Sequence, residues 1–87
     1  MKFRVLLHRK VESAIGRLDA RSRTRIIEKL RELEDFPNAR LDIVKIAGEE
    51  DTFRLRIGKF RALFKVYEKE NIIVLVNLDL RKRVYRP

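Results

Sequence analysis

Between residues 52 and 66, apolar and polar side chains alternate in the way that is typical of two short β-strands. The alternation is interrupted once, at Gly58-Lys59. A two-residue connection that begins with glycine suits a type II′ hairpin turn, whose first central residue needs a positive φ. This turn predicts a register in which Arg56 lies opposite Arg61. One face of the hairpin is then expected to be core, and its residues are Phe53, Leu55, Ile57, Phe60, Ala62, Phe64 and Val66.

The opposite face of the predicted hairpin carries four cations and no acid from the hairpin itself. Like charges directly opposite each other on neighbouring strands are destabilising, so stability does not explain the pair Arg56 and Arg61. We interpret this surface as a site for an anionic partner, in the first place a nucleic-acid backbone. The alternative is a solvated face whose long side chains splay apart. We call this set the cationic face: Arg54, Arg56, Arg61 and Lys65, accompanied by Leu63 and Tyr67.

We interpret the N-terminal residues 2–8 as a first strand. The segment after them has apolar residues at helical spacing. A first helix is predicted by apolar residues at i, i+3, i+4 and i+7. After a tight reversal, Asp19 is expected to cap a second helix, which Pro37-Asn38 stops. The two helices form an αα-hairpin. Their apolar stripes are Val11, Ala14, Ile15 and Leu18 in the first helix, and Ile26, Ile27, Leu30, Leu33 and Phe36 in the second.

Strands account for the remaining apolar segments. Residues 41–46 are expected to form one strand, and residues 47–51 a polar turn before the hairpin. The nearly continuous apolar run of residues 72–80 is typical of a central strand that is covered on both faces. The predicted fold is therefore α+β: an N-terminal strand, an αα-hairpin and a mainly antiparallel four-stranded meander, with the helices packed on one sheet face.

Charges on the second predicted helix run against its macrodipole. Arginines occupy its first turns and acids its last, whereas helices favour the reverse order. Two readings stay open: a tolerated cost on a solvated face, or a second binding patch for phosphate or an acidic protein segment. The residues concerned are Arg21, Arg23 and Arg25 at the start, and Glu32, Glu34 and Asp35 at the end.

Length and composition limit the remaining functions. The 87 residues suit a single domain, residues 1–87, and contain no run of apolar residues long enough to span a membrane and no signal peptide. Cysteine is absent, and His8 is the single histidine. We therefore expect no metal site, no cofactor and a cytoplasmic protein, with His8 at a strand end or helix entry.

The positive charge is concentrated in the C-terminal part of the chain. From residue 54 onward there are ten Lys and Arg against three Asp and Glu, a net charge of +7, whereas residues 1–53 carry +2. A local anion site explains this asymmetry better than general solubility does. The last seven residues continue it, with four cations around Tyr85.

Two motifs carry a resemblance to a known family: the hairpin FRLRIGKFRALFKV and, after the last predicted strand, LRKRVY. Together with the order of the elements, they resemble the RelE/ParE superfamily of toxins from type II toxin–antitoxin systems, and the RelE branch in particular. The resemblance covers nearly the whole chain. It implies ribosome-dependent cleavage of mRNA in the A site, through attack of the RNA 2′-hydroxyl on the adjacent phosphate without a metal.

The resemblance also assigns candidate residues. Arg61 matches the hairpin arginine of the family and Arg81 its post-strand arginine, so both are expected to hold phosphate and to stabilise developing charge. Tyr85 matches the family's tyrosine, as a base or as a stacking platform for a nucleobase. Further contacts to RNA phosphates are expected from Arg54, Arg56, Lys65, Lys82 and Arg83.

The chain departs from the family where proton transfer is concerned. Some members carry two lysines on the first hairpin strand, where this chain has Arg54 and Arg56. Arginine is not deprotonated in proteins, so neither residue can act as a general base. The carboxylate and histidine pair of other branches is also missing after the last strand. We therefore expect modest chemistry that relies on the ribosome to position the substrate.

Other functions remain possible at this point. A ParE-like protein would inhibit DNA gyrase by binding it, and would not need the set Arg61, Arg81 and Tyr85. A non-catalytic nucleic-acid-binding module would show salt-dependent binding without cleavage. A toxin of either branch implies an antitoxin, here a RelB-like partner. We expect an acidic, extended or helical chain that occupies the cationic face and contacts exposed apolar helix surface.

Overall fold

The predicted hairpin is the centre of the sheet. The structure, a computed structural model, describes residues 2–80. In it, β3 (Thr52–Ile57) and β4 (Phe60–Tyr67) pair antiparallel, and Arg56 lies opposite Arg61 as expected. Gly58 has a φ of +56°, whereas Lys59 is not among the described residues with a positive φ, which fits a type II′ turn. The register set by this turn is confirmed.

Three further strands complete a five-stranded sheet in the order β1-β5-β4-β3-β2. The strands β2 (Asp42–Lys45) and β5 (Ile72–Leu80) flank the hairpin antiparallel, which confirms the meander. The N-terminal strand β1 (Arg4–Leu7) pairs parallel with β5 and forms one edge of the sheet. Both β1 and β2 are shorter than the sequence indicated.

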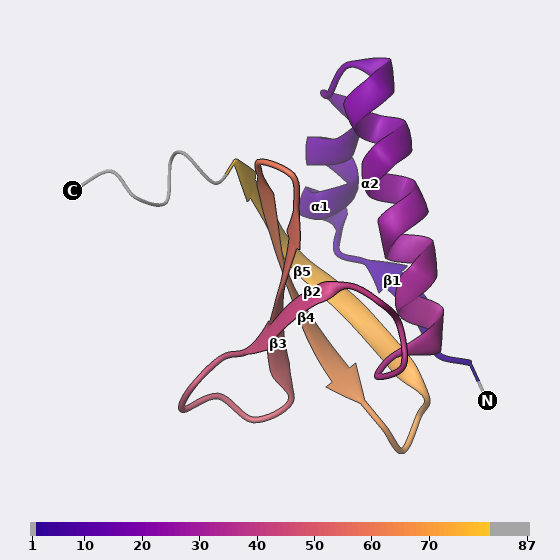
Figure 1. Cartoon of the computed structure of the whole chain (residues 1–87), viewed down its shortest axis with the longest axis vertical. Helices are drawn as coiled ribbons and strands as arrows, with labels where there is room; N and C mark the ends of the chain where they lie inside the picture. The colour runs from indigo at the N-terminus through magenta and orange to yellow at the C-terminus, as the bar shows by residue number, and fades with distance from the viewer. Residues whose placement is uncertain (1, 81–87) are drawn as a thin grey trace.

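Both helices lie on the same face of the sheet, as expected (Figure 1). The helix α1 (Arg9–Gly16) begins at His8, whose Nδ1 accepts a hydrogen bond of 3.1 Å from the Lys10 backbone N–H. This confirms the helix-entry role of His8. The helix α2 (Ala20–Glu32) is capped by Asp19, whose carboxylate accepts a hydrogen bond of 3.2 Å from the Ser22 backbone N–H. Hydrogen bonds from Ser22 lower the pKa of the Asp19 carboxyl.

The core forms where the helices meet the hairpin. A short 3₁₀ helix, η1 (Leu33–Asp35), follows α2 and leads to Phe36, which contacts three other phenylalanine rings at centroid distances between 5.1 and 6.1 Å. Of the core face predicted for the hairpin, all residues except the half-buried Phe53 are buried. The buried apolar side chains are Val11, Ile15, Ile26, Leu30, Leu33, Leu55, Ile57, Phe60, Ala62, Phe64, Val66, Ile73 and Leu75.

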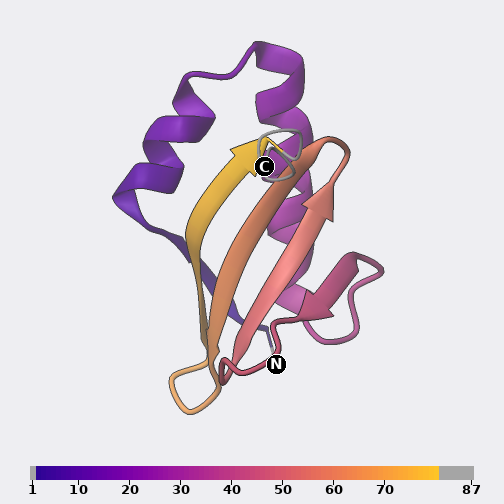
Figure 2. The same cartoon turned by 90° about the vertical axis from the view of Figure 1, so that its left-hand side faces the viewer.

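A bulge in β5 changes which of its apolar residues face the core, compared with the sequence prediction. Leu63 pairs with Asn77 but Phe64 pairs with Leu75, so Val76 is an extra residue. The bulge brings Leu78 to the same face as Leu75, so the apolar residues on both sides of it pack on one core. The prediction of a strand covered on both faces is therefore wrong. The other face of the sheet carries no helix of the described chain (Figure 2).

Two residues of the predicted helical stripes have other roles. Leu18 lies after the end of α1, although its side chain still packs against the core. Ile27 is 40% exposed instead of buried, because it lies beside the buried stripe and not within it. No helix in the described part of the chain is both long and apolar enough to cross a bilayer.

Two glycines should respond in opposite ways to replacement by alanine. At Gly16 an added Cβ would meet nothing within 4 Å, so Gly16→Ala should raise the free energy of unfolding, by up to about 1 kcal/mol. At Gly58 the Cβ would lie 2.9 Å from a guanidinium nitrogen of Arg25, and φ is positive. Gly58→Ala should therefore lower the free energy of unfolding, by about 1–3 kcal/mol. Urea unfolding followed by circular dichroism measures both, and changes of the same sign would contradict this account.

Candidate nucleic-acid interface

The sheet face opposite the helices, which we call the open face, gathers most of the predicted site residues that the structure describes. Figure 2 looks onto this face, with the helices behind it. Because residues paired across strands point to the same side, the register decides which side chains share it. They include Asp42, Arg54, Arg56, Arg61, Leu63, Lys65, Val74, Asn77 and Asp79.

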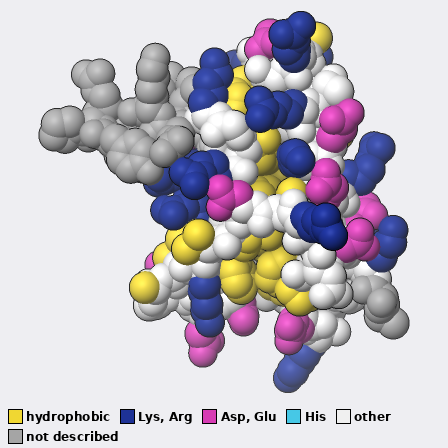
Figure 3. Space-filling model, viewed as in Figure 1, with side chains coloured by type: hydrophobic (Ala, Val, Ile, Leu, Met, Phe, Trp, Pro, Cys, Tyr) yellow, Lys and Arg dark blue, Asp and Glu magenta, His cyan; other side chains and the backbone are white. Residues whose placement is uncertain are grey.

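The four cations of the cationic face do lie together. Arg56 is exposed, and Arg54, Arg61 and Lys65 are half-buried, so their aliphatic stems cover the sheet while their charges reach its surface. Figure 3 shows Lys and Arg side chains gathered on the open-face side of the molecule, at the left, whereas cations and acids are interspersed over the helices. The arrangement offers several guanidinium groups to one anionic chain.

Neighbouring strands bring two acids to this face. Asp42 on β2 lies opposite Arg56, and Asp79 on β5 lies opposite Arg61. The Nε of Arg56 donates a hydrogen bond of 2.9 Å to a carboxylate oxygen of Asp42. Asp79 in turn accepts a hydrogen bond of 2.9 Å from the side-chain amide of Asn77. The like-charge pair of the hairpin is therefore flanked by an acid on each side.

Sequence reasoning missed both acids, for different reasons. The turn between β2 and β3 does not fix a register by its length, so the partner of Asp42 could not be read from it. Strict alternation from Leu75 would have placed Asp79 on the core side, and only the bulge at Val76 turns it to the open face. One sequence signal could have placed Asp42 on the open face: if Ile43 points to the core, alternation along the strand points Asp42 away from it.

The remaining predicted site residues, Arg81, Lys82, Arg83 and Tyr85, lie outside the described residues. What the structure does place is the end of β5. Leu80 pairs with Phe60, directly after the Gly58-Lys59 turn, and Asp79 pairs with Arg61. The chain therefore continues toward Arg81 from the end of the sheet at which Arg61 lies.

The three arginines at the start of α2 do not all share one surface: Arg21 and Arg25 line the same pocket, whereas Arg23 does not. Arg23 turns inward, where one of its guanidinium N–H groups donates a hydrogen bond of 2.8 Å to the Leu18 carbonyl. Arg25 places its guanidinium against Gly58, while Arg21 is exposed. The order of charges is also less unfavourable than expected, because α2 ends at Glu32 and its last turn carries Lys29 and Arg31. Glu34 and Asp35 belong to η1.

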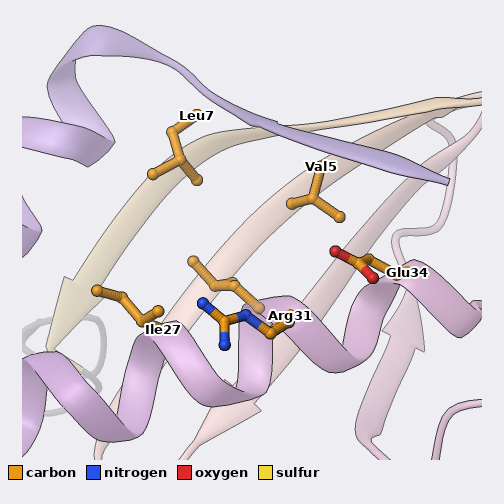
Figure 4. A pocket seen from close by; sticks show the side chains of 6 residues that line it. Val5, Leu7, Ile27, Arg31 and Glu34 are labelled. Carbon is orange, nitrogen blue, oxygen red and sulfur yellow. The ribbon is translucent and has the colours of Figure 1, made fainter.

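A second surface lies on the helix side of the sheet, between the edge strand β1 and α2. It is a groove of about 180 Å³ with apolar walls, which we call the edge groove. Figure 4 shows Val5 and Leu7 pointing from β1 toward α2, with Ile27 facing them. Leu7 and Ile27 are 37% and 40% exposed. The other residues that line the groove are Leu30, Arg31 and Glu34.

Among residues 2–80, no three His, Cys, Asp or Glu side chains come together as a group that could hold a metal ion. The candidate chemistry is that of guanidinium groups toward phosphate.

Comparison with known proteins identifies the family. No protein-family model matches the chain. It is 30% identical to a chain of the archaeal RelE–RelB complex from Pyrococcus horikoshii OT3, with a TM-score of 0.81 over 95% of this chain and 99% of that one. The chain belongs to the RelE family of toxins.

Further relatives agree with this assignment. RelE1 of Methanocaldococcus jannaschii is 28% identical over 88 residues, which cover 99% of this chain and 98% of the relative. A chain of the RelB–RelE antitoxin–toxin complex from Methanococcus jannaschii is 26% identical, with a TM-score of 0.70 over 92% of this chain and 94% of that one. The isolated RelE toxin of E. coli, at 14% identity and a TM-score of 0.74, shares the fold. The α+β fold is thus that of the RelE toxins.

Proposed function

We propose that this RelE-family toxin is a ribosome-dependent endoribonuclease that cleaves mRNA in the A site and so inhibits translation. The observation that carries the proposal is the placement of Arg56 and Arg61 side by side on the open face. They lie at the end of the sheet from which the chain continues into Arg81. A cluster of guanidinium groups at this position suits a phosphate that acquires charge during cleavage.

The proposed reaction is a displacement at phosphorus within the RNA, and water is its only further reactant. The 2′-hydroxyl gives its proton to water or to an ionised Tyr85 and attacks the adjacent phosphorus, while the bond from phosphorus to the 5′-oxygen breaks. The leaving 5′-oxygen takes up a proton from water. The products are a 2′,3′-cyclic phosphate and a 5′-hydroxyl end, so atoms and protons balance.

Each candidate residue has a role in this reaction. Arg61 and Arg81 stabilise the charge that develops on the phosphate oxygens through bidentate hydrogen bonds. Tyr85 acts as base or stacks on a nucleobase. The neighbouring phosphates of the RNA are held by the remaining cations, Arg54, Arg56, Lys65, Lys82 and Arg83.

The ribosome supplies what these residues do not. Guanidinium groups stabilise charge but do not accept protons, so positioning of the 2′-hydroxyl must provide much of the rate enhancement. This is the physical reason for expecting cleavage on ribosomes and little cleavage of free RNA. A protein with this role acts in the cytoplasm.

Substitution of Arg61 tests the reaction. Arg61→Ala should reduce mRNA cleavage in a reconstituted translation system by about 10²–10³-fold, the effect of removing one donor to a charged transition state. Primer extension on the translated mRNA measures the cuts and their register with the A-site codon. Lys29→Ala is the matched control, because it also removes one cation. Lys29 lies on α2, which is not part of the open face, and pairs there with Glu32.

The outcomes separate the possible functions. Cuts in register with the A-site codon, lost in Arg61→Ala and kept in Lys29→Ala, would support the nuclease. Growth arrest by the wild type without any cut on intact ribosomes would exclude it and direct attention to DNA gyrase. Salt-dependent RNA binding without cleavage would instead indicate a non-catalytic binding module.

We also propose a RelB-like antitoxin as the partner of this protein. Complexes of a RelE protein with RelB are among the structures that resemble it. The net charge of +9 favours an acidic partner over the open face. The edge groove suits the apolar part of the same interface, because Leu7 and Ile27 expose apolar surface there and no described strand lies beyond β1.

A charge placed in the edge groove should weaken this complex. Ile27→Asp should raise the dissociation constant of the antitoxin by at least tenfold, because it removes the apolar contact of Ile27 and adds a carboxylate that must lose its water when the partner covers the groove. Thr24→Asp is the control, since it adds the same charge to the same helix at a residue that does not line the groove. Titration calorimetry with the purified antitoxin measures both, and equal affinities for the two variants would remove the groove from the interface.

A further inference from the structure

The open face carries a row of four charges that crosses four strands. The register places Asp42 opposite Arg56, Arg56 opposite Arg61, and Arg61 opposite Asp79. The signs along the row are negative, positive, positive and negative, so its formal charge is zero. The two arginines proposed to bind phosphate therefore already have a carboxylate beside them within the protein.

The two acids are held differently. Asp79 is half-buried and accepts a hydrogen bond from Asn77 on its own strand. Asp42 is bonded to Arg56 across the strands, and the two side chains are 50% and 45% exposed. An exposed ion pair of this kind contributes little to stability and exchanges its partners readily. A carboxylate and a phosphate also use the same donors of a guanidinium group.

We propose that Asp42 is an internal competitor for RNA phosphate: its carboxylate occupies Arg56 in the free protein and must leave before Arg56 can bind the RNA backbone. This inference rests on the proposed function, since it concerns the same open face. It implies that Asp42 weakens binding to free RNA. An RNA strand that the ribosome presents at high local concentration overcomes this competition more easily than a strand in solution.

Binding of a single-stranded RNA oligonucleotide with 2′-O-methyl groups, which cannot be cleaved by 2′-hydroxyl attack, tests the competition without ribosomes. Fluorescence anisotropy gives the dissociation constant over a series of salt concentrations. Asp42→Asn should bind roughly fivefold more tightly at about 0.1 M salt. The slope of log K against log salt should steepen by less than the roughly 0.7 of a full phosphate contact, because Arg56 binds phosphate in both proteins and salt weakens only the competing ion pair.

The matched control is Glu32→Gln. It also removes one carboxylate from an exposed ion pair, here with Lys29 on α2 at 3.6 Å, and raises the net charge by one. Its affinity and salt slope should stay near those of the wild type. A second comparison uses the variant Arg56→Ala, in which the competitor has no arginine to occupy. There, adding Asp42→Asn should improve binding no more than adding Glu32→Gln does.

Three results would overturn the inference. Equal binding by Asp42→Asn and Glu32→Gln would show only a general effect of net charge. Weaker binding by Asp42→Asn would show that Asp42 positions Arg56 for RNA instead of competing with it. A gain that persists in full without Arg56 would place the effect elsewhere. Each of these leaves the proposed function intact, because A-site cleavage by the wild type on ribosomes is measured separately.

Discussion

The alternation of the β3–β4 hairpin is the constraint on which the rest of the molecule depends. Leu55 and Phe64 are fully buried against the helices, and each strand residue beside them must point the other way. Core burial thus forces Arg54, Arg56, Arg61 and Lys65 onto one surface. A slip of one residue in the register would bury these cations, which makes the packing of the core and the geometry of the open face inseparable.

This coupling explains why a pair of opposed arginines is tolerated. Arg56 and Arg61 repel each other across the hairpin, but strong burial on the opposite side holds their strands in register. The acids of β2 and β5 offset the repulsion from both sides. The open face therefore combines a fixed backbone with charged side chains at its surface, among them the half-exposed ion pair of Arg56 and Asp42. A site for a flexible, polyanionic chain needs this combination, because the scaffold sets the spacing and the side chains adapt.

Much of this architecture could be predicted from local patterns. The Gly58-Lys59 turn specified the hairpin and its register, and Asp19 specified the start of α2, since both depend on residues close together in the chain. The faces of β5 could not be predicted, because the bulge at Val76 lies in the pairing of β5 with β4 and no local sequence pattern marks it. For the same reason the sequence grouped the four cations correctly but missed the acids, whose positions depend on pairing between distant strands.

The two surfaces proposed to bind partners are linked by β1. Leu6 and Leu7 are both exposed, at 39% and 37%, and as strand neighbours they point to opposite faces. Leu7 lines the edge groove, whereas Leu6 pairs with Val74 and so belongs to the side of the open face. A partner segment that fills the groove is therefore separated from the open face only by the thickness of an edge strand. An antitoxin anchored by apolar contacts at this edge would need few further residues to bring acidic side chains over the cations. Apolar burial would supply its affinity, and charge complementarity would direct it to the surface that we propose binds RNA.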